Sequence, residues 1–228
     1  MAELILALDF SDRESALRLV DQLPTLRWVK VGSVLMTAEG PALVRELVAR
    51  ELSVFLDLKW HDIPNTVRGA VSAARGLGVR MVSVHLLGGP AMLRAAAEAA
   101  GDMAVVGVTV LTSHDEAEYA QTTGRPSVRV LDEVARLARL GMAAGLAGVV
   151  SSPLEVDRLR TGLGPGPFIV VPGIRRPSDA PDDQSRTATP VEALRQGATH
   201  LVIGRPVVQA LDPGAAFREL ESSLSDGR

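Results

Sequence analysis

The sequence predicts a (β/α)8 barrel, and three observations lead to that fold. Short apolar runs alternate eight times with stretches whose apolar residues have helical spacing. Runs such as Leu4–Leu8 are apolar throughout, which is typical of parallel strands that helices cover. The first run is followed by Leu8–Asp12 rather than by a glycine-rich nucleotide-binding motif, which disfavours a Rossmann fold. We therefore expect residues 1–228 to form one (β/α)8 TIM-barrel domain.

The predicted elements alternate strictly along the chain. Strands are expected at Glu3–Asp9, Arg27–Gly32, Ser53–Lys59, Arg80–Leu86, Ala104–Leu111, Ala147–Ser151, Phe168–Pro172 and Thr199–Gly204. Helices are expected at Ser11–Leu23, with Ser11 as N-cap, and at Ala38–Arg50, Asn65–Gly76, Pro90–Ala100, Ser127–Ala144, Pro153–Thr161, Pro190–Gln196 and Gly214–Leu224. The longest stretch without periodicity is Gly173–Pro190, which we expect to be a functional lid or a disordered loop.

The composition excludes several classes of function. The 24 basic and 27 acidic residues leave a net charge of −3, which gives no footprint for nucleic acid or an anionic membrane. Cysteine is absent, so there is no disulfide, cysteine nucleophile or thiolate metal site. The amino terminus is too acidic for a signal peptide, and no apolar run approaches the length of a membrane span. We expect a cytoplasmic protein.

Lysine occurs only at Lys30 and Lys59, whereas the other 22 basic residues are arginine. An ammonium group can give up a proton and a guanidinium group essentially cannot, so these two positions are candidates for chemistry. Both lie at the expected carboxyl ends of neighbouring strands, where (β/α)8 barrels carry their active sites.

Carboxylates are expected beside both lysines. Period-two geometry puts Phe55, Asp57 and Lys59 on one face of the third strand, pointing into the barrel mouth, and Asp9 ends the first strand. Opposite charges about 4 Å apart attract by roughly 4 kcal/mol at an effective dielectric of 20, so alternating signs keep these groups ionised. The alternative is a salt-bridge network that only fixes the barrel, although buried ion pairs stabilise proteins poorly.

Two loops at the same rim contain the residues of a phosphate site. Arg175 follows the seventh strand, and Gly204 and Arg205 follow the eighth, where barrels often bind phosphate. Arginine can hold phosphate through two hydrogen bonds, and glycine lets the backbone approach an oxygen closely. Gln184, in the long loop, is a candidate to fold over the same group. The alternative is that these are ordinary surface side chains, because arginine is abundant in this chain.

Two further features stay open on the residues alone. The polar residues of Asp62–Thr66 have an alternative explanation as caps of the following helix, with Pro64 in its entry turn. His85 either lines the pocket or is a satisfied buried histidine. The four histidines lack metal-ligand spacing, so we expect no metal site.

The segment Phe55–Thr66, Phe-Leu-Asp-Leu-Lys-Trp-His-Asp-Ile-Pro-Asn-Thr, resembles the signature of orotidine 5′-phosphate decarboxylases, which is Asp-x-Lys-x-x-Asp followed closely by Thr. Matches at the other strands have the order and spacing of the bacterial form and cover nearly the whole chain. They are Leu6–Asp9, Val29–Gly32, Thr109–Ser113, Val171–Arg175 and Val202–Arg205.

The resemblance implies decarboxylation of orotidine 5′-monophosphate to uridine 5′-monophosphate without a metal or cofactor. It implies that Asp57 lies against the substrate carboxylate, that Lys59 stabilises and then protonates a vinylic carbanion, and that Lys30 joins the charge array and contacts the ribose. It also implies a homodimer in which Asp62 and Thr66 reach the partner's site. The other substrate-binding residues that it implies are Asp9 on the ribose, Thr112 or Ser113 on the pyrimidine or neighbouring sugar, and Arg175, Gln184, Gly204 and Arg205 on the 5′-phosphate.

Three other functions remain as alternatives. Sugar-phosphate decarboxylases of the same superfamily share Asp-x-Lys-x-x-Asp but hold magnesium partly through an acid on strand two, where this chain has Lys30. Isomerase or aldolase chemistry would make Lys59 a Schiff-base nucleophile, whereas Asp57 and Asp62 would keep it protonated. A non-catalytic phosphate-binding protein would have no need of the charge array.

Overall fold

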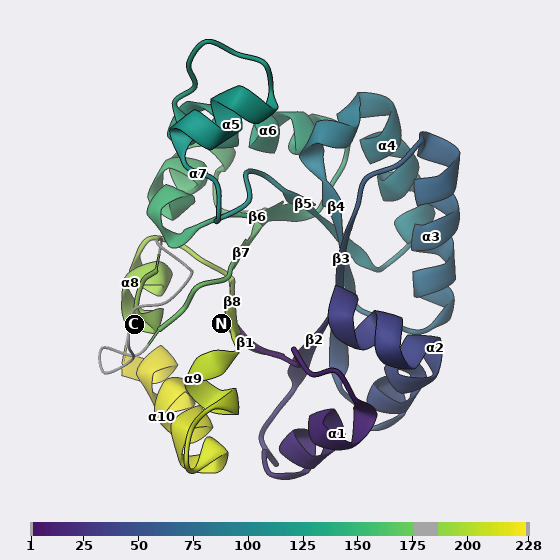
Figure 1. Ribbon diagram of the computed structural model, residues 1–228. Coiled ribbons are helices and arrows are strands. Elements are labelled where there is room, and N and C mark those ends of the chain that lie inside the picture. The colour runs from purple at the N-terminus through teal and green to yellow at the C-terminus, as the bar shows by residue number, and fades with distance from the viewer. Residues whose placement is uncertain (1, 176–186, 227–228) are drawn as a thin grey trace.

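The computed structural model describes residues 2–175 and 187–226, and it contains the predicted barrel. Figure 1 shows the strands around a central axis, with the helices outside them. Every strand pairs in parallel with the next one, and β1 pairs with β8 to close the sheet, which confirms the (β/α)8 fold. The strands are β1 (Glu3–Ala7), β2 (Trp28–Gly32), β3 (Ser53–Trp60), β4 (Met81–His85), β5 (Ala104–Val108), β6 (Gly148–Val150), β7 (Phe168–Val171) and β8 (His200–Ile203).

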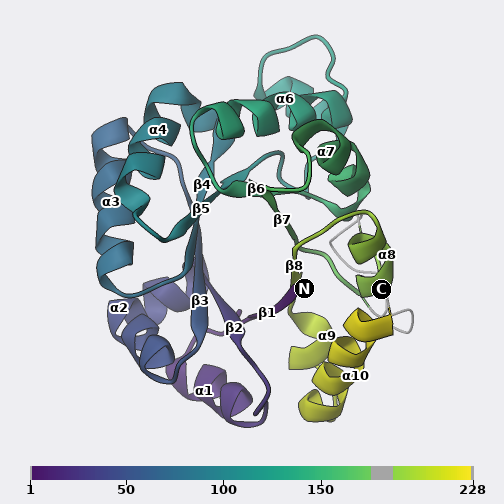
Figure 2. The same cartoon turned by 180° about the vertical axis from the view of Figure 1, so that it is seen from behind.

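The helices form the outer layer, which Figure 2 shows from behind. They are α1 (Arg13–Asp21), α2 (Ser33–Ala49), α3 (Pro64–Gly76), α4 (Gly89–Ala100), α5 (Glu116–Thr122), α6 (Val130–Ala143), α7 (Val156–Leu163), α8 (Pro190–Arg195), α9 (Arg205–Val208) and α10 (Pro213–Asp226). Short 3₁₀ helices, η1 (Leu86–Gly88) and η2 (Pro153–Glu155), precede α4 and α7. None of the helices in the described ranges is long and apolar enough to cross a membrane.

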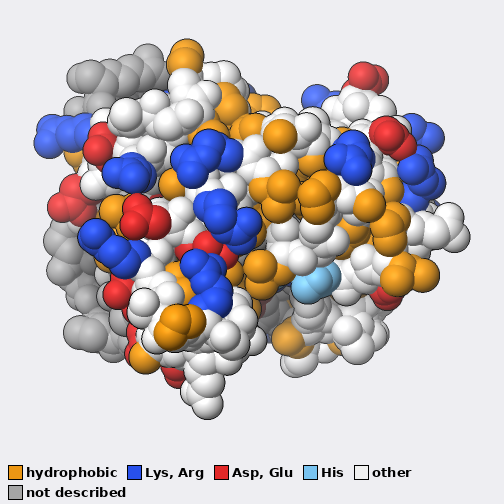
Figure 3. Space-filling model, turned by 90° about the horizontal axis from the view of Figure 1, so that it is seen from above, with side chains coloured by type: hydrophobic (Ala, Val, Ile, Leu, Met, Phe, Trp, Pro, Cys, Tyr) orange, Lys and Arg blue, Asp and Glu red, His pale blue; other side chains and the backbone are white. Residues whose placement is uncertain are grey.

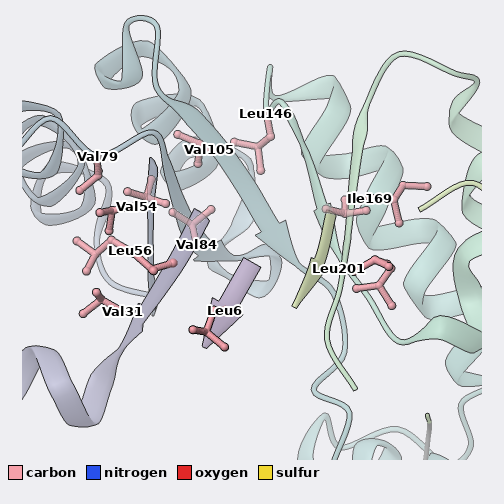
Figure 4. Packing of buried hydrophobic residues seen from close by; sticks show 14 of the residues in the cluster. Leu6, Val31, Val54, Leu56, Val79, Val84, Val105, Leu146, Ile169 and Leu201 are labelled. Atoms are coloured by element: carbon pink, nitrogen blue, oxygen red, sulfur yellow. The ribbon is translucent and has the colours of Figure 1, made fainter. Parts of the chain in front are cut away.

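Alternate side chains of the strands belong to two separate cores. Outward side chains, such as Leu6, Leu56 and Val84, pack against the helices, and Figure 4 shows part of this cluster. Burying one such side chain contributes about 1.5–3 kcal/mol. The inward side chains fill the barrel interior with a second cluster, which consists of Ile5, Ala7, Phe55, Met81, Val106, Val170 and Val202. Because the period is two, the next inward positions along these strands face the barrel mouth.

Aromatic rings pack at the amino-terminal end of the barrel. His200, at the start of β8, is buried, and its ring lies edge-on to Trp28 and Phe168, with centroids 5.6 and 4.9 Å away. Burial lowers the pKa of His200 to about 4, so this ring is neutral at pH 7. The interior is therefore packed at this end, and a site for chemistry has to use the opposite, carboxyl-terminal rim.

Several predicted helix boundaries were wrong. Asp12, not Ser11, is the N-cap of α1, because its carboxylate accepts the Ser15 N–H at 2.8 Å. α2 begins at Ser33 and not at Ala38. Its first turns have no side-chain cap that would mark the start in the sequence. The backbone also breaks at Gly40, with φ 65°, and Pro41 then resembles the first residue of a helix, so the predicted start was too late.

The segment before α6 was also mispredicted. α6 begins at Val130 rather than at Ser127, and the separate short helix α5 was not predicted. A capping box between Asp115 and Glu118 starts α5, so local side-chain hydrogen bonds define it rather than an apolar stripe. The four-residue helix α9 was missed because it is too short to show any periodicity.

Candidate active site

The first four strands carry polar side chains at the carboxyl-terminal rim. They continue the inward positions of apolar strands, so they face the barrel mouth above the interior cluster. The polar residues are Asp9 just after β1, Lys30 on β2, Asp57 and Lys59 on β3, and Ser83 and His85 on β4. These strands are neighbours in the sheet, and Gly32 of β2 is directly opposite Asp57 of β3.

One ion pair joins β2 to the end of β1. The Lys30 ammonium donates to the Asp9 carboxylate, with Nζ 2.8 Å from Oδ1. A Cβ atom at Gly32 would lie 3.0 Å from that Nζ and 3.4 Å from that Oδ1. Gly32 therefore leaves the room that the pair occupies, and a Cβ atom there would press on the ammonium and force it to shift slightly.

The second ion pair lies within β3. Lys59 Nζ is 2.8 Å from Asp57 Oδ2. The Asp57 side chain is only 11% exposed, whereas the Lys59 side chain is 41% exposed, so the ammonium faces the opening and the carboxylate lies below it. Both expected pairs are present at one rim. No ion pair links them to each other within the described part of the chain.

The backbone at Lys59 departs from the regular strand that period two assumes. Phe55 and Leu56 pair with Met81 and Val82, but the next pairing joins Trp60 to Val84, so β3 bulges between them. Lys59 has φ 50°, in the left-handed region. Its side chain reaches Asp57 from a bulge and not from a flat strand.

Ser83 of β4 holds this bulge. Its hydroxyl donates to Asp57 Oδ1 at 2.6 Å and accepts the Lys59 N–H at 2.9 Å. Sequence reasoning did not select Ser83. The signal was present, because Ser83 is the one polar residue within the run Met81–Val84 and has the same inward parity as His85.

His85 stacks on His61, with ring centroids 5.6 Å apart and an interplanar angle of 17°. Its Nδ1 accepts the Leu87 N–H at 3.3 Å. Burial, and then the positive charges of His61, Lys59 and His114, lower the pKa of His85 to about 4. The His85 imidazole is therefore uncharged at neutral pH and adds no positive charge near the Lys59 ammonium. Within the described residues, no group of acidic or histidine side chains could hold a metal ion.

Asp62 and Thr66 lie on the surface next to the rim. Asp62 Oδ1 accepts the N–H of the adjacent Ile63 at 2.6 Å, and the carboxylate has no ion pair within the described chain. Helix α3 begins at Pro64, one residue before the expected Asn65, and its N-cap residue, Ile63, makes no side-chain capping hydrogen bond. The interpretation of Asp62 as a helix cap was therefore wrong, and this exposed carboxylate has no local structural role of that kind.

The residues expected to bind phosphate lie across the rim from β3. Arg175 follows β7 and donates to the carbonyl of Ile174 at 3.2 Å. Gly204 follows β8 next to Asp9, because a Cβ there would be 3.9 Å from Asp9 Oδ2, and Arg205 begins α9. Thr112 follows β5 and is half-buried. Gln184 lies outside the described residues.

Comparisons with known proteins agree with one another. A family model described as "Orotidine 5'-phosphate decarboxylase / HUMPS family" matches residues 2–220. The chain is 46% identical to the orotidine 5'-phosphate decarboxylase of Nitrosospira multiformis, with 99% of this chain and 95% of that protein covered. It is 48% identical to the enzyme of Legionella pneumophila strain Paris, with 92% and 94% covered. Among solved structures, the orotidine 5'-phosphate decarboxylase of Lactobacillus acidophilus matches with a TM-score of 0.88, 32% identity, and coverage of 98% and 99%.

Proposed function

This chain belongs to the orotidine 5'-phosphate decarboxylase / HUMPS family, and on that premise we propose that it decarboxylates orotidine 5′-monophosphate to uridine 5′-monophosphate, a step of pyrimidine biosynthesis. The observation that carries the proposal is the Asp57–Lys59 pair, in which a buried carboxylate holds an accessible ammonium at the barrel mouth. This reaction needs a positive group where a carboxylate leaves and negative charge develops.

The two side chains of the pair have different roles. Asp57 lies against the substrate carboxylate, and their repulsion raises the energy of the bound substrate relative to the transition state. When carbon dioxide leaves, the electron pair of the broken carbon–carbon bond stays on the ring carbon. The Lys59 ammonium stabilises that carbanion and then transfers its proton to the same carbon. The chain's own groups complete this step, so we propose that it requires no metal or cofactor.

The rest of the nucleotide supplies binding energy. Asp9 and Lys30 contact the ribose, and Thr112 contacts the pyrimidine or the neighbouring sugar. Gly204 and Arg205, together with the two residues on the loop after β7 (Arg175 and Gln184), hold the 5′-phosphate. Binding of this remote group positions the ring over Lys59 and offsets the repulsion at Asp57.

The alternative within the family is decarboxylation of a sugar phosphate with a magnesium ion. That reaction requires an acidic ligand on the second strand, and β2 reads Trp-Val-Lys-Val-Gly. The position carries Lys30, whose ammonium would repel a cation. This observation favours the nucleotide substrate.

A homodimer that shares its active sites completes the proposal. Ile63 is 66% exposed, and the neighbouring Asp62 and Thr66 are also on the surface beside the rim. A single exposed isoleucine is ordinary on a protein surface, so the dimer is proposed from the family of the chain and from the exposed position of these two polar residues at the rim. We infer that Asp62 and Thr66 contribute to the site of a second subunit in the cytoplasm.

Mixing two inactive variants tests this arrangement. A hybrid of Lys59→Ala and Asp62→Ala subunits would have one intact site, so random pairing is expected to restore about one quarter of wild-type activity. No recovery, with a sedimentation mass of one 24.1 kDa chain, would contradict the shared site.

The decisive experiment for the function is an ultraviolet assay of the purified protein with orotidine 5′-monophosphate, run with and without a metal chelator. We expect loss of substrate absorbance at equal rates in both, with carbon dioxide and uridine 5′-monophosphate as products. Activity that disappears with the chelator would favour the magnesium-dependent alternative, and no turnover would contradict the proposal.

The phosphate site has its own test in Arg205→Ala. Loss of a charge-assisted contact of about 2–3 kcal/mol is expected to lower kcat/KM for the nucleotide about 100-fold, with far less effect on the nucleoside orotidine. Arg195→Ala, at the exposed end of α8, is the matched control and should leave both substrates unaffected. Equal losses for nucleotide and nucleoside would remove Arg205 from the phosphate site.

A further inference from the structure

Ser83 is a buried polar residue at the centre of the ion pair on β3. Its side chain is on the inward face of β4 and has no exposed surface. A buried hydroxyl needs hydrogen-bond partners, and a nearby backbone carbonyl would be sufficient. Ser83 instead makes both of its hydrogen bonds to the two residues of that pair, Asp57 and Lys59.

These contacts form a closed ring. Ser83 Oγ donates to one oxygen of Asp57 at 2.6 Å, and the other Asp57 oxygen accepts from Lys59 Nζ at 2.8 Å. The Lys59 N–H returns to Ser83 Oγ at 2.9 Å. The hydroxyl has a single proton, and it is committed to Asp57, so the ring fixes both the rotation of the carboxylate and the position of the Lys59 backbone.

The backbone at Lys59 requires such support. Its φ of 50° is unfavourable for a side chain with a Cβ, and such a conformation persists only where neighbouring contacts impose it. The β3–β4 ladder is interrupted between Leu56 and Trp60, so it offers the Lys59 N–H no regular partner. The Ser83 hydroxyl takes the place of that missing ladder bond.

We propose that Ser83 is a positioning residue for decarboxylation, because its hydroxyl holds the Lys59 bulge and the Asp57 carboxylate in the geometry that sets the ammonium over the reacting carbon. This role rests on the proposed function. Without the hydroxyl, one oxygen of Asp57 loses its partner, and Lys59 can relax out of the left-handed conformation and withdraw its ammonium. The phosphate and ribose contacts come from other strands and remain.

The test compares kcat with nucleotide affinity in Ser83 variants. Ser83→Ala is expected to lower kcat about 30-fold, because displacing a catalytic group by about 1 Å can cost up to a hundredfold, while affinity for uridine 5′-monophosphate changes less than about threefold. Ser83→Thr, which keeps the hydroxyl, should recover most of kcat. In Ser83→Cys, the cysteine is nearly the size of serine but its S–H is a weak donor, so we expect an intermediate kcat. This variant replaces Ser83→Ala in the test if the alanine variant does not fold.

Thr199→Val is the matched control. The Thr199 hydroxyl also accepts a backbone N–H from a neighbouring strand, that of Ile169 at 2.9 Å, but at the amino-terminal end of the barrel. Its loss should lower thermal stability and leave kcat unchanged.

Three outcomes would overturn the proposal. They are wild-type kcat in Ser83→Ala or Ser83→Cys, an equal kcat loss in Thr199→Val, and a fall in nucleotide affinity that matches the fall in kcat. An inactive wild-type protein would instead contradict the proposed function, so the two failures are distinguishable.

Discussion

Two buried carboxylates in this barrel have opposite surroundings. Glu133 of α6 is 3% exposed and accepts four hydrogen bonds, from the Tyr119 hydroxyl, from Arg125, and twice from Arg136, at 2.7–3.1 Å. Within the described residues, Asp57 accepts hydrogen bonds only from the Ser83 hydroxyl and from Lys59. Figure 3 looks onto the α5–α7 side of the molecule, where basic side chains gather on the surface. The carboxylate of Glu133 has its full complement of four hydrogen bonds, whereas that of Asp57 has two.

The difference separates a structural carboxylate from a chemical one. Two guanidinium groups and a phenol consume the hydrogen-bonding capacity of Glu133, so the cluster ties α5 and the following loop to α6 and has nothing left for a ligand. Asp57 orients one ammonium whose open side faces the barrel mouth. Arginine suits the structural cluster around Glu133, because its fixed, permanent charge can make several hydrogen bonds. Lysine suits the position beside Asp57, because its compact ammonium group can release a proton.

The largest expected effect comes from removing that ammonium. Lys59→Ala takes away a charge worth roughly 4 kcal/mol at 4 Å and also the proton donor, so kcat should fall about 10⁵-fold. Lys59→Arg keeps the charge and is also expected to be nearly inactive, because guanidinium does not give up its proton. Steady-state kinetics and uridine 5′-monophosphate titration measure both effects. Near-normal decarboxylation by either variant would contradict the assignment of Lys59 as the proton donor.

Glu133→Gln tests whether the Glu133 cluster serves stability alone. It leaves two guanidinium groups facing a neutral amide and should lower the free energy of unfolding by about 2–3 kcal/mol, with kcat per folded molecule unchanged. Urea denaturation measures the loss. Glu98→Gln, in the exposed Arg68–Glu98 pair, is the matched control and should cost less than about 1 kcal/mol. A loss of kcat in Glu133→Gln would show that the saturated cluster also serves the reaction.

The smallest effect is a pH dependence of stability. Hydrogen bonds from Arg136 above all lower the pKa of Glu133 to about 2, from an ordinary value of 4.5. Its contribution is therefore complete above pH 4.5 and is lost as the pH falls toward 2. Burial and the Glu133 charge raise the pKa of Tyr119 to about 12, so the phenol's contribution is lost as the pH rises from 10 toward 12. Each amounts to about 2 kcal/mol after solvent screening of the half-exposed arginines. Urea midpoints measured across pH test this. The double variant Glu133→Gln, Tyr119→Phe should lack these two contributions to the fall in stability at low and at high pH. The same pH dependence in the variant as in the wild type would contradict the assignment.

The sequence predicted what depends on repetition. All eight strands are where the alternation indicated, and Asp57 has the inward parity of Phe55, because burial enforces a period of two over a continuous strand. It could not predict the bulge at Lys59, because the bulge depends on a partner strand whose register shifts. The inward parity of Ser83 was visible in the sequence, but not which groups its hydroxyl would bind. The Glu133 cluster escaped for a similar reason, since a glutamate on a helix looks solvent-facing until another helix covers it.

The packed aromatic floor around His200 also determines how molecules reach the site. Because the described residues pack that end of the barrel, nucleotide and carbon dioxide are expected to enter and leave at the carboxyl-terminal rim, where the Lys59 side chain is accessible. The departing uridylate blocks the route by which the next orotidylate arrives, so inhibition by product should be competitive with substrate.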